Sequence, residues 1–208
     1  HVNTDALDHQ DAQLYTKVIA QVATASGATV IVFSNNLSGK AIAPRLSVRL
    51  KAGLVSGAVG LPDTSGGFVV KKNVFSGKAF ANISVNTGIK IIALNPNAYQ
   101  TISGEGTAEV VPFTATVDPS GVKLVSVSKA SGEVPLTEAE IVVSAGRGMK
   151  GPENWGIVEE LAKTLHAATA CSRPVADAHW RPHNEHVGQT GFAIAPNLYI
   201  AIGISGAI

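Results

Sequence analysis

IVVSAGRGMKGPENWGIVEELAKTLHAATACSR, residues 141–173, is the stretch that decides the fold of this chain. It opens with a short apolar run, residues 141–145, and continues with a glycine-rich segment, residues 146–151. An amphipathic segment follows to about His166, and a second short apolar run ends at Cys171. Short apolar runs predict strands and amphipathic spacing predicts a helix, so the stretch is interpreted as strand, glycine loop, helix and strand.

The glycine loop has the spacing of a nucleotide-binding turn. Gly146, Gly148 and Gly151 follow the pattern G-x-G-x-x-G between the predicted strand and helix, where glycine lets a ligand approach the main chain closely. Pro152 suits the first turn of a helix, and the free amides at such a helix start are expected to bind an anion. Arg147 adds a forked positive charge that is suited to phosphate.

The end of the second strand departs from the usual NAD pattern. An NAD site has an acidic residue there for the ribose hydroxyls, and this chain has Ser172 and Arg173. The arginine favours a more anionic or electron-rich ligand over NAD. From the loop alone, two interpretations stay open: nucleotide binding and a purely structural glycine turn.

The composition bounds the class of protein. With 208 residues, of which 45% are hydrophobic and 15% charged, the chain is long enough for one large or two small well-buried domains. The formal net charge of +1 gives no general attraction to nucleic acid or anionic membranes. Cys171 is the single cysteine, so no intrachain disulfide is possible and a reducing compartment fits. No apolar run approaches the length of a membrane span, and no signal peptide is visible.

The periodicity predicts an α/β fold of two domains, each a mostly parallel sheet layered with helices, the second one Rossmann-like. Before residue 95 it predicts helices at 12–26 and 40–51, a buried strand at 29–33, and further strands at 54–61, 68–72, 73–75, 79–85 and 90–94. Residues 95–140 are rich in proline and glycine and are interpreted as a connecting region with extended segments. We expect the domain boundary near Ser128, with domains at 1–128 and 129–208.

The loop after the second strand contains His179, His183 and His186. Neutral imidazoles could bind zinc, but the irregular spacing and the missing cysteine ligands favour a surface loop, and no metal site is predicted. Gln189 and Thr190 lie between two glycines, where short hydrogen-bonding side chains can approach the edge of a planar ligand. The alternative is a glycine-rich turn that leads into a strand at residues 192–195.

No group for covalent or acid–base catalysis stands out. The nucleophile pattern G-x-S-x-G does not occur, and no paired carboxylates are evident. Cys171 lies at an apolar strand end and is predicted to pack in the core. Lys71, Lys72 and Lys78 are predicted to lie on the exposed face of an edge sheet, with a partner contact as the alternative.

Four segments resemble one family in this order along the chain. They are VSAGRGMK at 143–150, ACSRP at 170–174, HVGQTG at 186–191 and LYIAIGISGAI at 198–208. Together they resemble the FAD domain of the α subunit of electron transfer flavoprotein. Residues 39–46 and 75–79 are similar to the amino-terminal α/β domain of the same family.

The resemblance implies an electron carrier rather than an enzyme. It implies a heterodimer with a β subunit and an FAD held mainly by the second domain of the α subunit. The flavin would accept electrons from acyl-CoA and related dehydrogenases of fatty acid β-oxidation and pass them to a membrane quinone reductase. The implied compartment is the bacterial cytoplasm, which we favour, or the mitochondrial matrix.

The resemblance also implies roles for single residues. Arg147 should meet the phosphate or ribose region of FAD, and Ser172 and Arg173 should lie at the isoalloxazine ring, where a cation stabilises the anionic reduced flavin. Thr190 should offer its hydroxyl to the reactive nitrogen of the ring. The residues implied to line the rest of the site are Val187, Gly188 and Gln189 in the same loop, and Ser205, Gly206, Ala207 and Ile208 in a second turn.

The chain departs from the family pattern at its ends. A Gln, a His, an Asn and an Asp that the family carries beyond this turn have no counterpart, and the strands that open the first domain are missing. The final apolar run predicts a strand and the start of a second glycine turn, so we expect a fragment of a longer protein. Two other readings remain: an adenine-nucleotide-binding α/β enzyme that uses the loop at residues 146–151, and a structural fragment whose glycines only shape turns.

Overall fold

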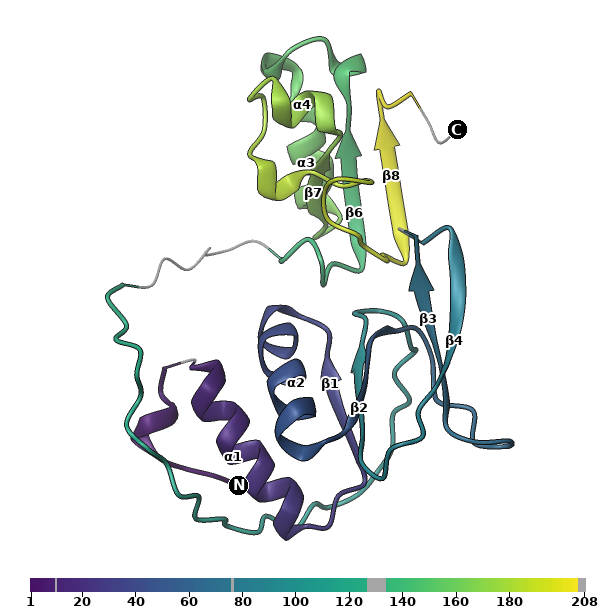
Figure 1. Cartoon of the computed structure of the whole chain (residues 1–208). Helices are drawn as coiled ribbons and strands as arrows, with labels where there is room; N and C mark the ends of the chain where they lie inside the picture. The colour runs from purple at the N-terminus through teal and green to yellow at the C-terminus, as the bar shows by residue number, and fades with distance from the viewer. Residues whose placement is uncertain (10, 76, 127–133, 206–208) are drawn as a thin grey trace. The chain divides into compact units, whose positions relative to one another are not determined.

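The computed structural model describes residues 1–9, 11–75, 77–126 and 134–205, and its backbone divides into two compact units, residues 1–128 (unit 1) and 129–208 (unit 2). Each unit has its own sheet (Figure 1). Unit 1 contains the 3-10 helix Asp5–Leu7, the helices α1 (Ala12–Ala25) and α2 (Leu37–Leu50), and the strands β1 (Val30–Ser34), β2 (Gly53–Ala58), β3 (Val69–Val74), β4 (Ala79–Ser84) and β5 (Lys90–Leu94). Unit 2 contains β6 (Ile141–Ala145), the 3-10 helices Arg147–Met149 and Pro152–Asn154, α3 (Gly156–Thr164), β7 (Ala168–Cys171), α4 (Arg173–Asp177), the 3-10 helix His183–Glu185 and β8 (Leu198–Ile202). The predicted α/β class is confirmed.

The sheet of unit 1 has the strand order β1-β5-β2-β3-β4. The strands β1, β5 and β2 are parallel, and β3 and β4 form an antiparallel hairpin at one edge. Ile91 and Ile92 of β5 are consecutive, so their side chains point to opposite faces. Ile91 packs with Leu46 of α2 and Ala20 of α1, whereas Ile92 packs in a second cluster with Val55. The helices therefore cover the Ile91 face of the sheet.

Capping residues set the starts of the two helices of unit 1. The side chain of Asp11 accepts hydrogen bonds from the amides of Gln13 and Leu14 at the start of α1. The side chain of Asn36 accepts from the amide of Gly39 at 2.9 Å, so α2 begins at Leu37 and not near residue 40 as predicted. The cap was missed because the apolar spacing that predicts a helix becomes visible only further along the segment.

The strands of unit 1 differ from prediction in three places. Val30 and Val32 of β1 are 42% and 62% exposed, so the strand predicted to be buried has one open face. The strand β2 ends at Ala58 and not at Leu61, and its register with β5 shifts between Ser56 and Ala58. The runs predicted as two strands at 68–72 and 73–75 form the single strand β3.

The segment after β5 has no regular secondary structure, as expected of a connecting region: among the described residues from 95 to 126 no helix or strand occurs. Side chains of α1 hold this segment in place. The amide group of Gln21 pairs with both the carbonyl and the amide of Thr116, at 2.8 and 2.9 Å. The hydroxyl of Ser120 donates to Asp11 at 2.6 Å, and Lys17 lies 2.5 Å from Asp118. Residue 128, where we predicted the boundary, lies outside the described residues.

The sheet of unit 2 is parallel throughout and has the order β7-β6-β8. The helix α3 covers one face, on which Trp155, Val158 and Ala162 pack against Val143 and Ala145 of β6. Trp155 is 3% exposed, which confirms its predicted core role. A crossover helix that connects two parallel strands makes β6-α3-β7 a βαβ unit.

Two local features of unit 2 differ from the sequence analysis. A short helix that was not predicted, α4, begins directly after β7, since Ser172 is extended and Pro174 occupies the first turn, which proline favours. The strand predicted at 192–195 is a single bridge between Val187 and Phe192.

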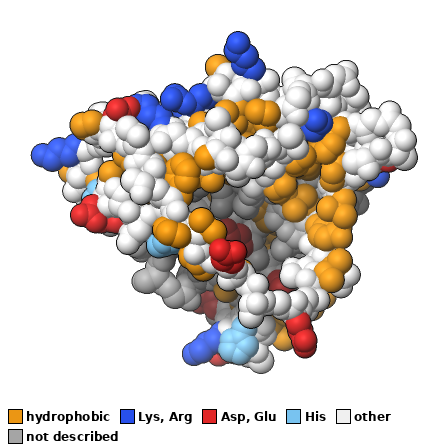
Figure 2. Space-filling model, turned by 90° about the horizontal axis from the view of Figure 1, so that it is seen from below, with side chains coloured by type: hydrophobic (Ala, Val, Ile, Leu, Met, Phe, Trp, Pro, Cys, Tyr) orange, Lys and Arg blue, Asp and Glu red, His pale blue; other side chains and the backbone are white. Residues whose placement is uncertain are grey.

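The surface carries both signs of charge. Figure 2 shows lysine, arginine and acidic side chains on the same face, with hydrophobic side chains exposed between them. The described part of the chain contains no helix that is both long and apolar enough to cross a membrane.

Candidate functional site

The carboxyl edge of the unit 2 sheet brings together most of the predicted site residues. Ala145 at the end of β6 pairs with Cys171 at the end of β7 and with Ile202 at the end of β8. The residues that follow each strand therefore meet at one edge. These residues are Arg147 after β6, Ser172 and Arg173 after β7, and Ser205 after β8. Ligands of open parallel sheets bind at this kind of edge.

A loop from further along the chain is fixed beside the same edge. His186 forms a parallel bridge with Cys171, and the amide of Val187 donates to the Cys171 carbonyl at 3.1 Å. The chain then turns back, with hydrogen bonds from Gly191 to the Gly188 carbonyl at 3.1 Å and from Phe192 to the His186 carbonyl at 2.8 Å. The turn therefore has fixed ends.

The centre of that turn presents Gln189 and Thr190, which are both exposed. A Cβ atom at Gly191 would lie 2.2 Å from the His186 carbonyl oxygen, so the turn cannot close with a larger residue there. Gly188 has φ +135°, which L side chains rarely adopt. The two glycines are thus required by the turn, and the two polar side chains between them are exposed to solvent.

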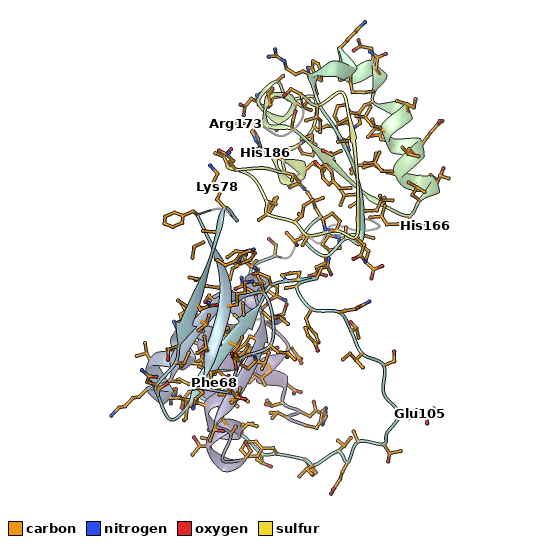
Figure 3. All side chains as sticks on the ribbon, turned by 90° about the vertical axis from the view of Figure 1, so that its right-hand side faces the viewer. Phe68, Lys78, Glu105, His166, Arg173 and His186 are labelled. Atoms are coloured by element: carbon orange, nitrogen blue, oxygen red, sulfur yellow. The ribbon has the colours of Figure 1, made fainter. Side chains whose placement is uncertain are left out.

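The two arginines of the site are accessible. Arg147 is exposed, and the Arg173 side chain is 62% exposed, with one contact of 3.3 Å to Asp177. An exposed pair of this kind has little energetic value, so the Arg173 guanidinium can bind a ligand. The Ser172 side chain makes no capping bond to α4. Figure 3 shows Arg173 and His186 at one end of unit 2 and His166, which precedes β7, at the other.

Several amides at the glycine loop are bonded within the protein, and the anion site expected there stays a prediction. The amides of Gly146 and Gly148 donate to the carbonyls of Ile202 and Gly203, at 2.9 and 2.8 Å. The amides of Asn154 and Trp155 donate to backbone carbonyls of 3-10 turns, and α3 begins only at Gly156. Amides that are already bonded within the protein cannot receive a phosphate. The glycine spacing instead allows the turns after β6 and β8 to touch.

Cys171 is fully buried, as predicted. Burial raises the pKa of its thiol to about 11, and the nearby Glu185 carboxylate acts in the same direction. The sulfur is therefore neutral at pH 7 and packs beside Val175 and Ala176.

The sequence analysis did not predict the ion cluster formed by Arg181, Glu185 and Glu159. Arg181 donates to Glu185 and to Glu159 of α3, and hydrogen bonding to Glu185 raises the pKa of Arg181 further. The spacing of Arg181 and Glu185 by four residues was a signal for this pair, but the prolines and histidines of the segment had suggested an irregular loop.

Neither the pair His179 and His183 nor a hollow in unit 2 coincides with the site. The rings of His179 and His183 are 6.2 Å apart and edge-on, and within 1–9, 11–75, 77–126 and 134–205 no three His, Cys, Asp or Glu side chains are placed to hold a metal. A hollow of about 700 Å³ is lined by Glu159, His166 and Phe192, among others, and shares no residue with the predicted site.

The residues at the carboxyl edge fit a flavin dinucleotide. Two accessible guanidinium groups match its negative charges, and the side chains of Ser172, Gln189 and Thr190 offer hydrogen bonds to a planar ring. Val187 is half-buried and packs against the cluster formed by Ala139, Val142, Ala168 and Ala170, and Ser205 is exposed after β8. The remaining predicted residues, Gly206, Ala207 and Ile208, lie outside the described residues.

Two family models match the chain. Residues 1–118 match a family model described as the electron transfer flavoprotein domain, and residues 135–208 match one described as the electron transfer flavoprotein FAD-binding domain. FAD is thus the cofactor of the domain family that contains the carboxyl edge.

Curated relatives match over most of the chain. The electron transfer flavoprotein subunit alpha of Bacillus subtilis is 35% identical over 93% of this chain and 61% of its own length. The corresponding subunit of Thermoanaerobacterium thermosaccharolyticum is 34% identical over 100% of this chain and 65% of its own length. That of Pseudomonas aeruginosa is 37% identical over 82% and 55%. The chain thus spans about three fifths of the length of the curated relatives it matches.

Proposed function

The chain belongs to the electron transfer flavoprotein family, among its α subunits, and from this we propose that it carries electrons on an FAD held at the carboxyl edge of the β7-β6-β8 sheet. The observation that supports this proposal most is the convergence of Arg147, Ser172, Arg173 and Thr190 at that edge. When bound, FAD supplies the isoalloxazine ring that accepts and releases electrons. The protein itself then has only to bind, orient and electrostatically tune the cofactor.

Each residue has a proposed part in this task. Arg147 binds the phosphate or ribose region, because an accessible guanidinium forms forked hydrogen bonds with phosphate. Arg173 sets a positive charge beside the ring and so favours its more negative, reduced state. Thr190 donates its hydroxyl to the ring, while Gln189, Gly188 and Val187 line the same side and Ser172 adds a second hydroxyl. Ser205, Gly206, Ala207 and Ile208 are proposed to bind the remaining part of the cofactor.

The neutral state of Cys171 supports this assignment. A thiolate directly behind Ser172 and Arg173 would cancel part of the positive field at the ring. Because the pKa of Cys171 is about 11, the thiol stays protonated at neutral pH and adds no negative charge beside Arg173. The site therefore supports a charge-tuning role and no covalent chemistry.

We propose a heterodimer with a β subunit as the working form. Acyl-CoA and related dehydrogenases would donate the electrons, and a membrane quinone reductase would accept them. The bacterial origin of the relatives supports the bacterial cytoplasm as the compartment. The alternative, an adenine-nucleotide-binding enzyme that uses the loop at 146–151, is weakened because the amides of Gly146 and Gly148 are already bonded.

The absorbance of the chain produced together with its β subunit tests the proposal. The predicted result is a yellow complex with flavin bands that are bleached by a dehydrogenase and its acyl-CoA substrate. A colourless complex that binds ATP or NADP would instead support the nucleotide-binding enzyme.

A further inference from the structure

Arg181 is the centre of a compact ion cluster in unit 2. Its Nε and Nη2 atoms donate to the two carboxylate oxygens of Glu185, at 2.8 and 2.5 Å, and its Nη1 donates to Glu159 at 2.6 Å. The guanidinium carbon lies 5.8 Å from the centre of the Trp155 ring. Arg181 therefore connects the 3-10 helix His183–Glu185 to α3, and all its contacts have defined directions.

The cluster differs from the other arginine pair of the same spacing. The side chains of Arg181 and Glu185 are 19% and 10% exposed, whereas those of Arg173 and Asp177 are 62% and 55% exposed and make one contact of 3.3 Å. A buried, two-pronged pair holds its geometry, and an exposed single contact does not. Only the Arg181 pair is thus suited to fix a backbone position.

The position that it fixes is the entry to the flavin loop. Glu185 directly precedes His186, which pairs with Cys171 at the end of β7, and Val187 follows with its own bond to Cys171. We propose that Arg181 is a positioning residue: through Glu185 it holds the turn of residues 187–190 in the position from which Thr190 reaches the flavin ring. This inference rests on the proposed function, since it concerns the same flavin.

Residues of this one loop would then have different roles. Gln189 and Thr190 contact the ring, and Arg181 contacts no ligand but prevents the turn from moving along the edge of β7. Loss of the pair should loosen the turn while the β6-α3-β7 core, which is apolar, stays folded.

The test uses two variants of the chain produced with its β subunit, and amide hydrogen exchange as its first measurement. Arg181→Met leaves the buried Glu185 carboxylate unpaired, which lowers stability on its own. The double variant Arg181→Met/Glu185→Met removes both charges and restores an uncharged interior. Glu160→Gln is the matched control, because it removes an exposed carboxylate of α3 that lies outside the cluster.

We expect the amides of residues 187–192 to exchange about tenfold faster or more in the double variant after flavin removal, with exchange in β6 and β7 unchanged. We also expect its flavin midpoint potential to differ from that of the unaltered protein and of Glu160→Gln. Exchange and potential equal to those of the unaltered protein in a folded double variant would overturn the positioning role. Absence of flavin from the unaltered complex would instead overturn the proposed function, so the two failures can be told apart.

Discussion

Gly148 and Gly203 pack backbone against backbone: the Gly148 amide donates to the Gly203 carbonyl at 2.8 Å, and a Cβ atom on Gly148 would lie 2.6 Å from the Gly203 Cα. The contact joins the turns that follow β6 and β8, which are neighbours in the sheet. The strands β7 and β8 lie on opposite sides of β6, and ligands of open parallel sheets bind at such a point. The two glycines thus let the turns after β6 and β8 meet at the carboxyl edge of the sheet.

Substitution of Gly148 tests this contact. Gly148→Ala would force the Gly203 backbone away, and we expect a loss of about 1–3 kcal/mol in the free energy of unfolding. Gly156→Ala is the control, because a Cβ at Gly156 meets no atom within 4 Å. In a helix, alanine in place of glycine raises stability by up to about 1 kcal/mol. Urea unfolding of both variants measures the difference, and equal effects would show that the contact with Gly203 has no energetic role.

Cys171 should be unreactive until the protein unfolds. Its pKa is raised from 9.0 to about 11, so almost no thiolate exists at pH 8, and the sulfur is fully buried. Alkylation by iodoacetamide at pH 8 is expected to follow global unfolding. Between about pH 9 and 11 the unfolded thiol releases its proton while the folded thiol retains it, so stability should fall with rising pH. Rapid alkylation of the folded chain would contradict the burial of this residue.

The Asp11 carboxylate should stabilise unit 1 through its hydrogen bonds with both the start of α1 and the Ser120 hydroxyl. Asp11 caps α1, and the Ser120 hydroxyl lowers its pKa below 3.8. At pH 7 we expect Asp11→Ala to cost about 1 kcal/mol, the usual value of a cap. Ser120→Ala, which keeps the cap, should cost less.

The pH dependence of the Asp11 effect follows from the same shift. A folded pKa below the unfolded one stabilises the protein above pH 3.8, and this contribution disappears as the pH falls through the folded pKa. Thermal midpoints at pH 7 and pH 3 measure it. A difference between the Asp11→Ala variant and the unaltered chain that does not shrink at pH 3 would contradict the assignment.

The sequence could predict those parts of the fold that depend on local pattern. The helix at residues 12–26 and the strands β5 and β6 were predicted within one or two residues, because apolar spacing and buried runs determine them. The start of α2 and the whole of α4 were missed, because Asn36 and Ser172 act through backbone geometry that no periodicity reveals.

Local sequence patterns also could not predict how the residues of the candidate site are arranged. Motif residues could be recognised singly, but their convergence depends on strand order, and a spacing of glycines does not show which atoms approach them. The loop of residues 146–151 was therefore interpreted as a phosphate cradle, although the Gly203 backbone lies against Gly146 and Gly148. Arg181 was missed because its partner Glu159 is distant along the chain and adjacent only in the folded unit.

Arg147 should control flavin affinity and leave the potential unchanged. Loss of one charge-assisted contact to phosphate in Arg147→Ala is expected to weaken FAD binding by about 10- to 100-fold. Lys163→Ala is the control, because it also removes one positive charge. Lys163 lies in the last turn of α3, just before β7 begins and so at the opposite edge of the sheet, and its loss should leave the affinity unchanged. Fluorescence titration of the flavin-depleted complex measures both. Equal affinities of the two variants would remove Arg147 from the site.

The midpoint potential of the flavin in Arg173→Ala tests the central claim most directly, namely that the carboxyl edge of unit 2 tunes an FAD by positive charge. We predict a potential lower by tens of millivolts, since a tenfold change in the relative affinity for two redox states equals about 59 mV for a one-electron couple. A potential equal to that of the unaltered complex, with FAD still bound, would contradict the account.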